Sequence, residues 1–322
     1  DPVEPLLWGL GFLVLCIVVV VRGVSQGIEK VSKVLMPLLF LLLAGLVVYS
    51  VTRPGAGEGL RFLFGIDPAR LSGDTLVGAL GQAFFSLSVG MGIMVTYGSY
   101  VPKSENLAKS AGWICALDTL VAVMAALAIV PVVMITQGEE GLGMGGGFAF
   151  ISLPAMFAEL PGGRFFGTAF FALLFLAALT SAISILESLV AFLTEEFHLS
   201  RARAAIGLSV PMALLSAGYS LSQSAGRGIN LPWFDFKNGL QMLPMNAVME
   251  KFTDNLMIPL GALCFCLFVG WVWGTKAAGQ EIAGEHGLRR MQKPWAFAVR
   301  FLAPLVIVVI LYFTLGMGEG LS

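Results

Sequence analysis

Eight long apolar runs, nearly free of charged residues, constrain this chain more than any other feature of its sequence. A helix needs about 20 apolar residues to cross the hydrocarbon core of a bilayer, and runs of this kind recur along the whole chain. We predict spans at residues 6–21, 34–51, 76–101, 112–135, 165–192, 204–219, 255–273 and 295–315. None of them alternates as a membrane strand does. The sequence therefore predicts an all-α, multi-pass bundle that forms one transmembrane domain over residues 1–322.

The composition excludes the main soluble classes. Only 12% of the residues are charged, against about 25% in soluble proteins. The 19 Lys and Arg residues balance 20 Asp and Glu residues, which leaves no excess of basic charge for nucleic acid. All four cysteines lie inside apolar runs, which is typical of small buried side chains rather than of metal ligands or disulfides. No nucleophile–base set or phosphate-binding loop is present, so we expect no enzyme and no organic cofactor.

The basic residues predict an orientation. The loops and helix ends after the first, third, fifth and seventh spans hold twelve of the 19 Lys and Arg residues. By the positive-inside rule, those loops are predicted to be cytoplasmic. We expect the protein to lie in the plasma (inner) membrane of the cell. Arg22, rather than a small-residue cleavage site, follows the first run, so we interpret that run as a span and not a signal peptide. It would run from outside to inside, which favours further spans upstream.

Two outer loops are predicted to do more than connect spans. Residues 145–161 are apolar and rich in Phe, and we expect them to fold back as a re-entrant or lid element. The alternative is a helix that lies on the bilayer surface. Residues 222–244 carry Gly, Ser and Asn, and we expect an irregular outer loop there.

The third span has an unusual middle, with the sequence Phe84-Phe85-Ser86-Leu87-Ser88-Val89-Gly90-Met91-Gly92. Glycine is a weak helix former, and serine side chains can replace backbone partners that unwinding frees. An unwound segment exposes carbonyl groups and a helix N-terminus, which transporters use to hold cations and carboxylates. The alternative is a closely packed face of small residues, with Ser86, Gly90 and Met94 at four-residue spacing. The pattern alone favours neither.

Polar residues inside the fourth and fifth spans are candidate ion ligands. Asp118 is costly in hydrocarbon and is expected to face a cavity, an ion or a partner. The hydroxyls of Thr180 and Ser181 and the carbonyl of Ala177 are neutral oxygens that suit an alkali cation. Such hydroxyls also commonly bond back to their own helix. Glu187, two turns further on, is expected to form a structural or gating pair.

These motifs resemble a known family. The chain is similar to the neurotransmitter:sodium symporters, in their bacterial amino-acid branch, most specifically through the Phe-Phe-Ser-Leu-Ser-x-Gly-x-Gly pattern quoted above. The matching stretches are residues 22–30, 36–37, 81–92, 96–100 and 179–184. The resemblance covers residues 6–315 and corresponds to the fourth to eleventh helices of that family. It implies an inverted five-plus-five repeat with eight of about eleven helices present, the first three being absent.

The resemblance implies a substrate site at the middle of the third span. Six residues would contact the substrate: Phe85, Ser86, Ser88, Met91, Ser181 and Ile185. Phe85 would be the aromatic lid and gate, and Ser86 and Ser88 would lie in the unwound segment. Met91 and Ile185 would face the substrate side chain.

Two sodium sites are implied in the same way. Ser86 and Asp118 would hold the first ion, and the carbonyl of Ala177 with Thr180 and Ser181 would hold the second. Glu250 falls where the outer gate normally has Asp, although a solvated helix N-terminus explains an acidic residue there equally well.

The resulting expectation is sodium-coupled symport of a small amino acid, apolar or bulky, by alternating access. The partners would be that amino acid, two co-transported sodium ions and the lipid bilayer, with no nucleic acid and with a homodimer left open. The alternative is an uncoupled channel or a receptor-like membrane protein that uses the same bundle.

Overall fold

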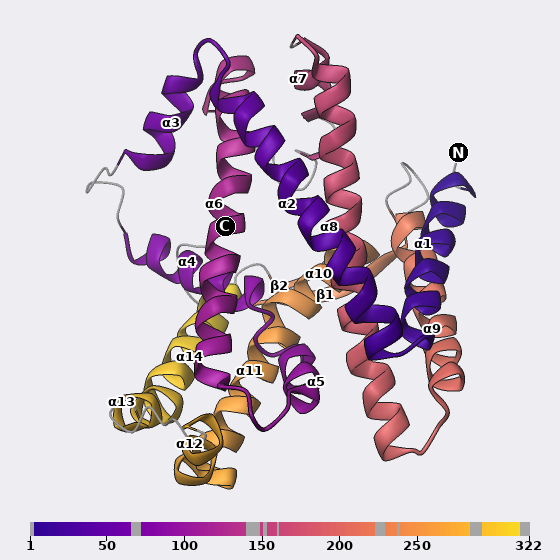
Figure 1. Ribbon diagram of the computed structural model, residues 1–322, viewed down its shortest axis with the longest axis vertical. Helices are drawn as coiled ribbons and strands as arrows, with labels where there is room; N and C mark the ends of the chain where they lie inside the picture. The colour runs from indigo at the N-terminus through magenta and orange to yellow at the C-terminus, as the bar shows by residue number, and fades with distance from the viewer. Residues whose placement is uncertain are drawn as a thin grey trace. The chain divides into compact units, whose positions relative to one another are not determined.

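The protein is described by a computed structural model. The described residues are 3–65, 72–139, 149–150, 153–159, 161–222, 229–236, 239–283 and 292–315, and almost all of them are helical (Figure 1). The α-helices are α1 Val3–Val21, α2 Lys30–Val51, α3 Ala56–Phe64, α4 Gly73–Ser86, α5 Ile93–Tyr100, α6 Leu107–Thr136, α7 Leu153–Glu159, α8 Gly163–Glu196, α9 Arg201–Ser222, α10 Met245–Glu250, α11 Ile258–Leu267, α12 Thr275–Ala283, α13 Gln292–Phe297 and α14 Ala303–Thr314. Wider π-helical turns join some of them: η1 Val24–Glu29, η6 Lys251–Met257, η7 Phe268–Gly274 and η8 Ala298–Leu302.

Seven helical segments of the described chain are long and apolar enough to cross a membrane. They are Val3–Val21, Val24–Val51, Leu107–Thr136, Gly163–Glu196, Arg201–Ser222, Met245–Ile282 and Gln292–Thr314. Each overlaps one of the eight predicted spans. The remaining predicted span, residues 76–101, is divided between α4 and α5, which have 14 and 8 residues. It therefore forms no single helix of membrane-spanning length.

The predicted irregular loop at residues 222–244 is wrong in part. Strands β1 Asn230–Asp235 and β2 Gly239–Pro244 pair antiparallel, with Asn230 opposite Pro244 and Asp235 opposite Gly239. Apolar and aromatic residues such as Trp233 and Phe234 favour a strand, and Asn238-Gly239 is a strong hairpin-turn sequence. The overall Gly, Ser and Asn content hid that local signal.

The chain divides into two compact units. Unit 1 consists of Asp1–Val21, Ala69–Cys115 and Ser184–Ser322, and unit 2 consists of Arg22–Pro68 and Ala116–Ile183. The prediction of one transporter domain over residues 1–322 is not tested by this division and stays a prediction.

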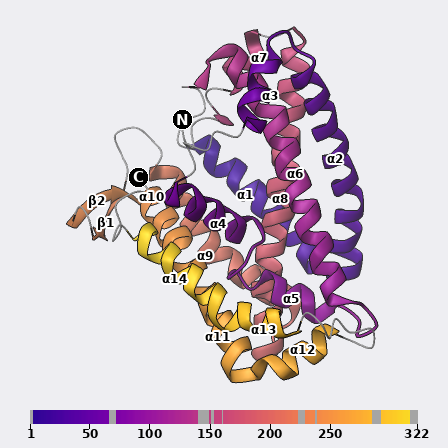
Figure 2. The ribbon, with the colours of Figure 1, turned by 90° about the vertical axis from the view of Figure 1, so that its left-hand side faces the viewer.

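Unit 1 is built from helix pairs. α1 and α9 lie side by side (Figure 1), with Val20, Ala204 and Ala205 almost fully buried. α11 packs along α14, and α14 also contacts α4 (Figure 2). Many of the remaining apolar side chains are exposed, as expected of helices whose outer faces meet lipid.

The hydrophobic core of unit 2 is formed by α2, α6, α7 and α8. Its buried members are Leu43, Leu46, Tyr49, Ala128, Val132, Val133, Leu153, Phe157 and Phe170. Tyr49 stacks on Phe166 with ring centroids 3.7 Å apart, and its hydroxyl donates to the carbonyl of Pro161 at 3.1 Å. α7, which belongs to the predicted lid at residues 145–161, thus packs into this core. Residues 145–148, 151–152 and 160 of that prediction lie outside the described residues.

Candidate functional site

The chain leaves the helical conformation at the middle of the third predicted span. α4 starts at a capping box, in which the hydroxyl of Ser72 accepts from the amide of Thr75 at 3.2 Å. It ends at Ser86, and α5 begins only at Ile93. Between them Ser88, Gly90 and Gly92 have positive φ angles of 53°, 96° and 77°. The structure therefore decides for unwinding, the first of the two interpretations of this sequence.

The break also contains a close helix contact. A Cβ atom at Gly90 would overlap the carbonyl oxygen of Ile258 and would lie 2.8 Å from the amide nitrogen of Ala262, both on α11. Gly261 in turn faces the carbonyl oxygen of Gly90. Glycine is thus required at position 90 by backbone conformation and by packing. The close contact is made by Gly90 within the unwound segment and not by a helical face of Ser86, Gly90 and Met94.

Phe85 lines a cavity beside the break. The cavity has a volume of about 300 Å³ and is lined by residues of α4, of η6 and α11, and of α14. Gln82 and Phe85 come from α4, Asp254 from η6, and Ile307 and Thr314 from α14. Its walls are mainly apolar with a few polar groups, as ligand pockets usually are.

The predicted gate residue Glu250 lies at the end of α10, next to η6. The hydroxyl of Tyr219 on α9 donates to its carboxylate at 2.7 Å. Asp254, four residues further on, lines the cavity described above. Glu250 itself is exposed, so the hydrogen bond from Tyr219 does not decide between a gate and a solvated helix end, and its role as a gate stays a prediction.

The predicted ligands of the second sodium ion lie on one turn of α8. The hydroxyl of Thr180 donates to the carbonyls of Ala177, at 2.9 Å, and Leu176, at 3.2 Å. Ser181 is exposed and follows directly. Hydroxyl oxygens that donate to a carbonyl keep lone pairs that can accept a cation. Asp118, half-buried on α6, belongs to the same unit.

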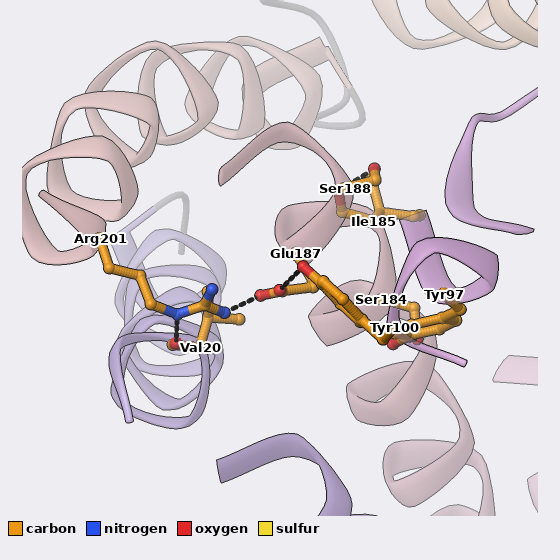
Figure 3. Close-up of polar contacts among 8 residues, drawn as sticks. All are labelled: Val20, Tyr97, Tyr100, Ser184, Ile185, Glu187, Ser188 and Arg201. Atoms are coloured by element: carbon orange, nitrogen blue, oxygen red, sulfur yellow. Dashed lines mark hydrogen bonds and ion pairs between the residues drawn. The ribbon is translucent and has the colours of Figure 1, made fainter. Parts of the chain in front are cut away.

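A buried ion pair joins α8 to α9 in unit 1 (Figure 3). The carboxylate of Glu187, which is 0% exposed, accepts from the guanidinium of Arg201 and from the hydroxyl of Tyr100 at 2.7 Å. Arg201 also donates through Nε to the carbonyl of Val20 at the end of α1, at 2.9 Å. One carboxylate thus connects α5, α8 and α9, and the arginine extends the connection to α1.

A second hydrogen bond between α5 and α8 lies one helical turn before Glu187. The hydroxyl of Tyr97 on α5 donates to the hydroxyl of Ser184 on α8 at 2.8 Å (Figure 3). The two tyrosines therefore attach the helix that follows the break to α8. The sequence predicted a structural or gating pair at Glu187 but named neither Arg201 nor the tyrosines.

A model of the sodium:neurotransmitter symporter family matches residues 5–319. The chain belongs to this family. Its members are transporters and not enzymes, and sodium is the ion that they co-transport. The family and its membrane-spanning helices make the chain part of a multi-pass plasma-membrane protein.

Individual relatives agree with this assignment. An uncharacterized sodium-dependent transporter, YhdH, of Bacillus subtilis (strain 168) is 33% identical over 98% of this chain and 68% of its own length. The sodium-dependent dopamine transporter of Bos taurus is 24% identical over 96% of this chain and 44% of its own length. The crystal structure of MhsT in complex with L-phenylalanine superposes with a TM-score of 0.81 and 37% identity over 98% of this chain and 69% of MhsT. The chain thus spans about two thirds of the length of YhdH and of MhsT.

In this symporter chain the predicted site residues belong to different units. Unit 1 holds Phe85, Ser86, Ser88, Met91, Ile185 and Glu250, and unit 2 holds Asp118, Ala177, Thr180 and Ser181. Within unit 1, Phe85, Ser86, Ser88 and Met91 lie on or beside the break. Within unit 2, Ala177, Thr180 and Ser181 share one turn. The roles that the resemblance gave these ten residues stay predictions.

Proposed function

We propose that the protein couples the entry of a small amino acid with an apolar, bulky side chain to the entry of two sodium ions, by alternating access. The observation that carries this proposal is the break between α4 and α5. There, the backbone is not helical next to the hydroxyls of Ser86 and Ser88, and a cavity lies beside it.

A helix break of this kind can supply the polar groups that a zwitterion needs. An interrupted membrane helix offers backbone N–H groups with positive partial charge to a carboxylate, and carbonyls with negative partial charge to an ammonium or a cation. The strained conformation of Ser88, a non-glycine residue with a φ of 53°, costs about 1–3 kcal/mol. Strain of this kind concentrates at functional sites.

The oxygen atoms of α8 suit sodium. The carbonyl of Ala177 and the hydroxyls of Thr180 and Ser181 are hard, neutral donors on one turn for the second ion. Ser86 and Asp118 supply a hydroxyl and a carboxylate for the first ion. A carboxylate at one site offsets part of the charge that two cations bring into a low-dielectric interior. These donors support the two-site proposal.

Coupling follows if sodium and the amino acid order the same segment. Each ligand then lowers the free-energy cost of ordering the site for the other, and this linkage is reciprocal. Ser86 would serve both ligands, because it is assigned to the substrate site and to the first sodium site.

The substrate class is supported by two observations. Met91 and Ile185 supply flexible and branched apolar side chains, which suit a bulky apolar substrate. MhsT, to which this chain is similar, was crystallised in complex with L-phenylalanine. We therefore propose phenylalanine and other large apolar amino acids as the first candidates.

The test is uptake of labelled phenylalanine into proteoliposomes that hold the protein expressed from its complete gene. An inward sodium gradient should concentrate the amino acid above its external level, and an equal potassium gradient should not. Flux that only equilibrates phenylalanine would contradict coupling and favour the channel. Binding without flux would favour the receptor.

A further inference from the structure

The cytoplasm-facing start of α2, as predicted from the charge distribution, carries a groove that the proposed transport cycle does not use. The groove has a volume of about 830 Å³, and its polar wall is formed by Arg22, Ser25, Gln26, Glu29, Lys30 and Lys33. All six side chains are exposed and belong to unit 2. Arg22 lies in the turn before η1, and the other five lie on η1 and the first turn of α2.

The groove has an excess of positive charge. Lys33 forms an ion pair with Glu29, with Nζ and Oε1 2.6 Å apart. Across the part of the chain that the structure describes, no carboxylate lies within ion-pair distance of Arg22 or Lys30. Two cationic side chains therefore point into an open groove beside a pair that neutralises itself. The hydroxyl of Ser25 and the amide of Gln26 add uncharged hydrogen-bond donors.

An apolar stripe continues from the groove along α2. Val34, Leu38, Leu41 and Val48 follow Lys30 at helical spacing, and they are between 42% and 70% exposed. The opposite face, which includes Leu43 and Leu46, is buried in the core of unit 2. On a helix long enough to cross a bilayer, an exposed apolar stripe meets acyl chains.

We propose that this groove binds the phosphate headgroup of an anionic phospholipid, with the acyl chains along the stripe from Val34 to Val48. Arg22 and Lys30 supply charge complementary to the phosphate, and a guanidinium can bind two phosphate oxygens at once. The predicted orientation places the groove at the cytoplasmic leaflet, whose surface carries the anionic lipids that attract basic segments. A free anion would gain nothing from the apolar stripe, so we commit to a lipid.

Native mass spectrometry of the purified protein in detergent tests this proposal. Phosphatidylglycerol and phosphatidylcholine with identical acyl chains are titrated separately, and their apparent dissociation constants are compared. Phosphatidylglycerol should bind more tightly to the unchanged protein. The double variant Arg22→Gln/Lys30→Gln should weaken phosphatidylglycerol binding about 30-fold, since each basic side chain near anionic lipid contributes about a factor of five. Its phosphatidylcholine binding should not change.

Two further variants keep the test decisive. Glu29→Gln releases Lys33 and should tighten phosphatidylglycerol binding about fivefold. Lys103→Gln/Lys109→Gln removes the same charge from the turn before α6 and the start of α6, also on the predicted cytoplasmic side, and it should leave binding unchanged.

Four outcomes would overturn the proposal. These are equal binding of the two lipids to the unchanged protein, no loss in the Arg22/Lys30 variant, an equal loss in the Lys103/Lys109 variant, or full displacement of phosphatidylglycerol by soluble glycerol phosphate. The last result would show a site for a free phosphate rather than for a lipid.

Discussion

Thr180 shows how one side chain can serve a helix and an ion. Its hydroxyl bonds back to the carbonyl of Ala177, which is the ordinary behaviour of threonine in a membrane helix. Thr168, three turns earlier on α8, makes the same kind of bond to the carbonyl of Arg164 at 2.8 Å. Thr168 is exposed and lies outside the proposed sodium site, whereas Thr180 is half-buried and belongs to it. Thr168 is therefore a control for the loss of the intrahelical hydrogen bond alone.

We therefore expect Thr180→Ala/Ser181→Ala to raise the sodium concentration for half-maximal uptake about tenfold or more, because interactions with a charged partner contribute about 1.5–3 kcal/mol each. Thr168→Ala should leave the sodium titration unchanged. The measurement is phenylalanine uptake at increasing sodium in proteoliposomes. A normal sodium titration in a well-folded double variant would exclude the assignment.

Asp118 leads to an expectation about charge balance. Two sodium ions and a zwitterion bring two net positive charges into a low-dielectric site, where uncompensated charge is costly. Asp118 supplies a carboxylate, while Ala122, one turn further on, offers no hydroxyl to an anion. Uptake should therefore continue when gluconate replaces chloride, and Asp118→Asn should lose activity or become stimulated by chloride. An unchanged protein that stops without chloride would refute this explanation.

For individual residues, the sequence identified the candidate side chains better than the groups that they contact. Asp118, Thr180 and Glu187 are conspicuous because polar groups are rare in long apolar runs. Arg201 is not, since it looks like an ordinary basic residue at a loop. Its pairing with Glu187 depends on how α8 and α9 turn back on one another, which no local pattern encodes.

Among the elements, the break between α4 and α5 is the one on which the proposed site depends. Gly90 and Gly92 both have positive φ angles, but only Gly90 faces the backbone of α11. An alanine at either position is strained by about 1 kcal/mol or more, and at Gly90 it also overlaps Ile258.

Gly90→Ala should therefore lower the unfolding temperature of the detergent-solubilised protein clearly more than Gly92→Ala does. The difference should correspond to about 1–3 kcal/mol, the usual cost of overpacking. Intrinsic tryptophan fluorescence during heating would measure it. Equal shifts for the two variants would argue against close contact between the break and α11.

The break and the hairpin show what sequence patterns can and cannot decide about elements. Glycine and serine at mid-membrane indicated that the third span was special, but the choice between unwinding and packing depended on α11, which lies about 170 residues further along the chain. The hairpin was missed because the composition of the whole loop was weighed above Asn238-Gly239. Long apolar helices needed no such context, since length and hydropathy define them.

In the molecule as a whole, the Glu187–Arg201 pair and its hydrogen bonds connect four helices. Removing one partner of a buried ion pair costs about 3–5 kcal/mol, because the other charge is left uncompensated. Arg201→Gln should thus destabilise the protein strongly, whereas Glu187→Gln/Arg201→Gln should be less destabilised than the two single changes predict together. Unfolding temperatures of the three variants form a double-mutant cycle. Additive shifts would show that the two side chains are not coupled.

The break between α4 and α5 also affects which side of the membrane each later loop is assigned to. α4 and α5, at about 1.5 Å per residue, together extend about 33 Å, which is close to the thickness of the hydrocarbon core. Two half-helices can therefore make one crossing, although neither is long enough by itself. Among the described residues, seven helical segments are long and apolar enough to span a membrane, and that set omits this crossing. If this crossing is omitted, every loop after Tyr100 is assigned to the wrong side of the membrane. An epitope or a reactive cysteine placed near Lys276 would then be assigned to the wrong face.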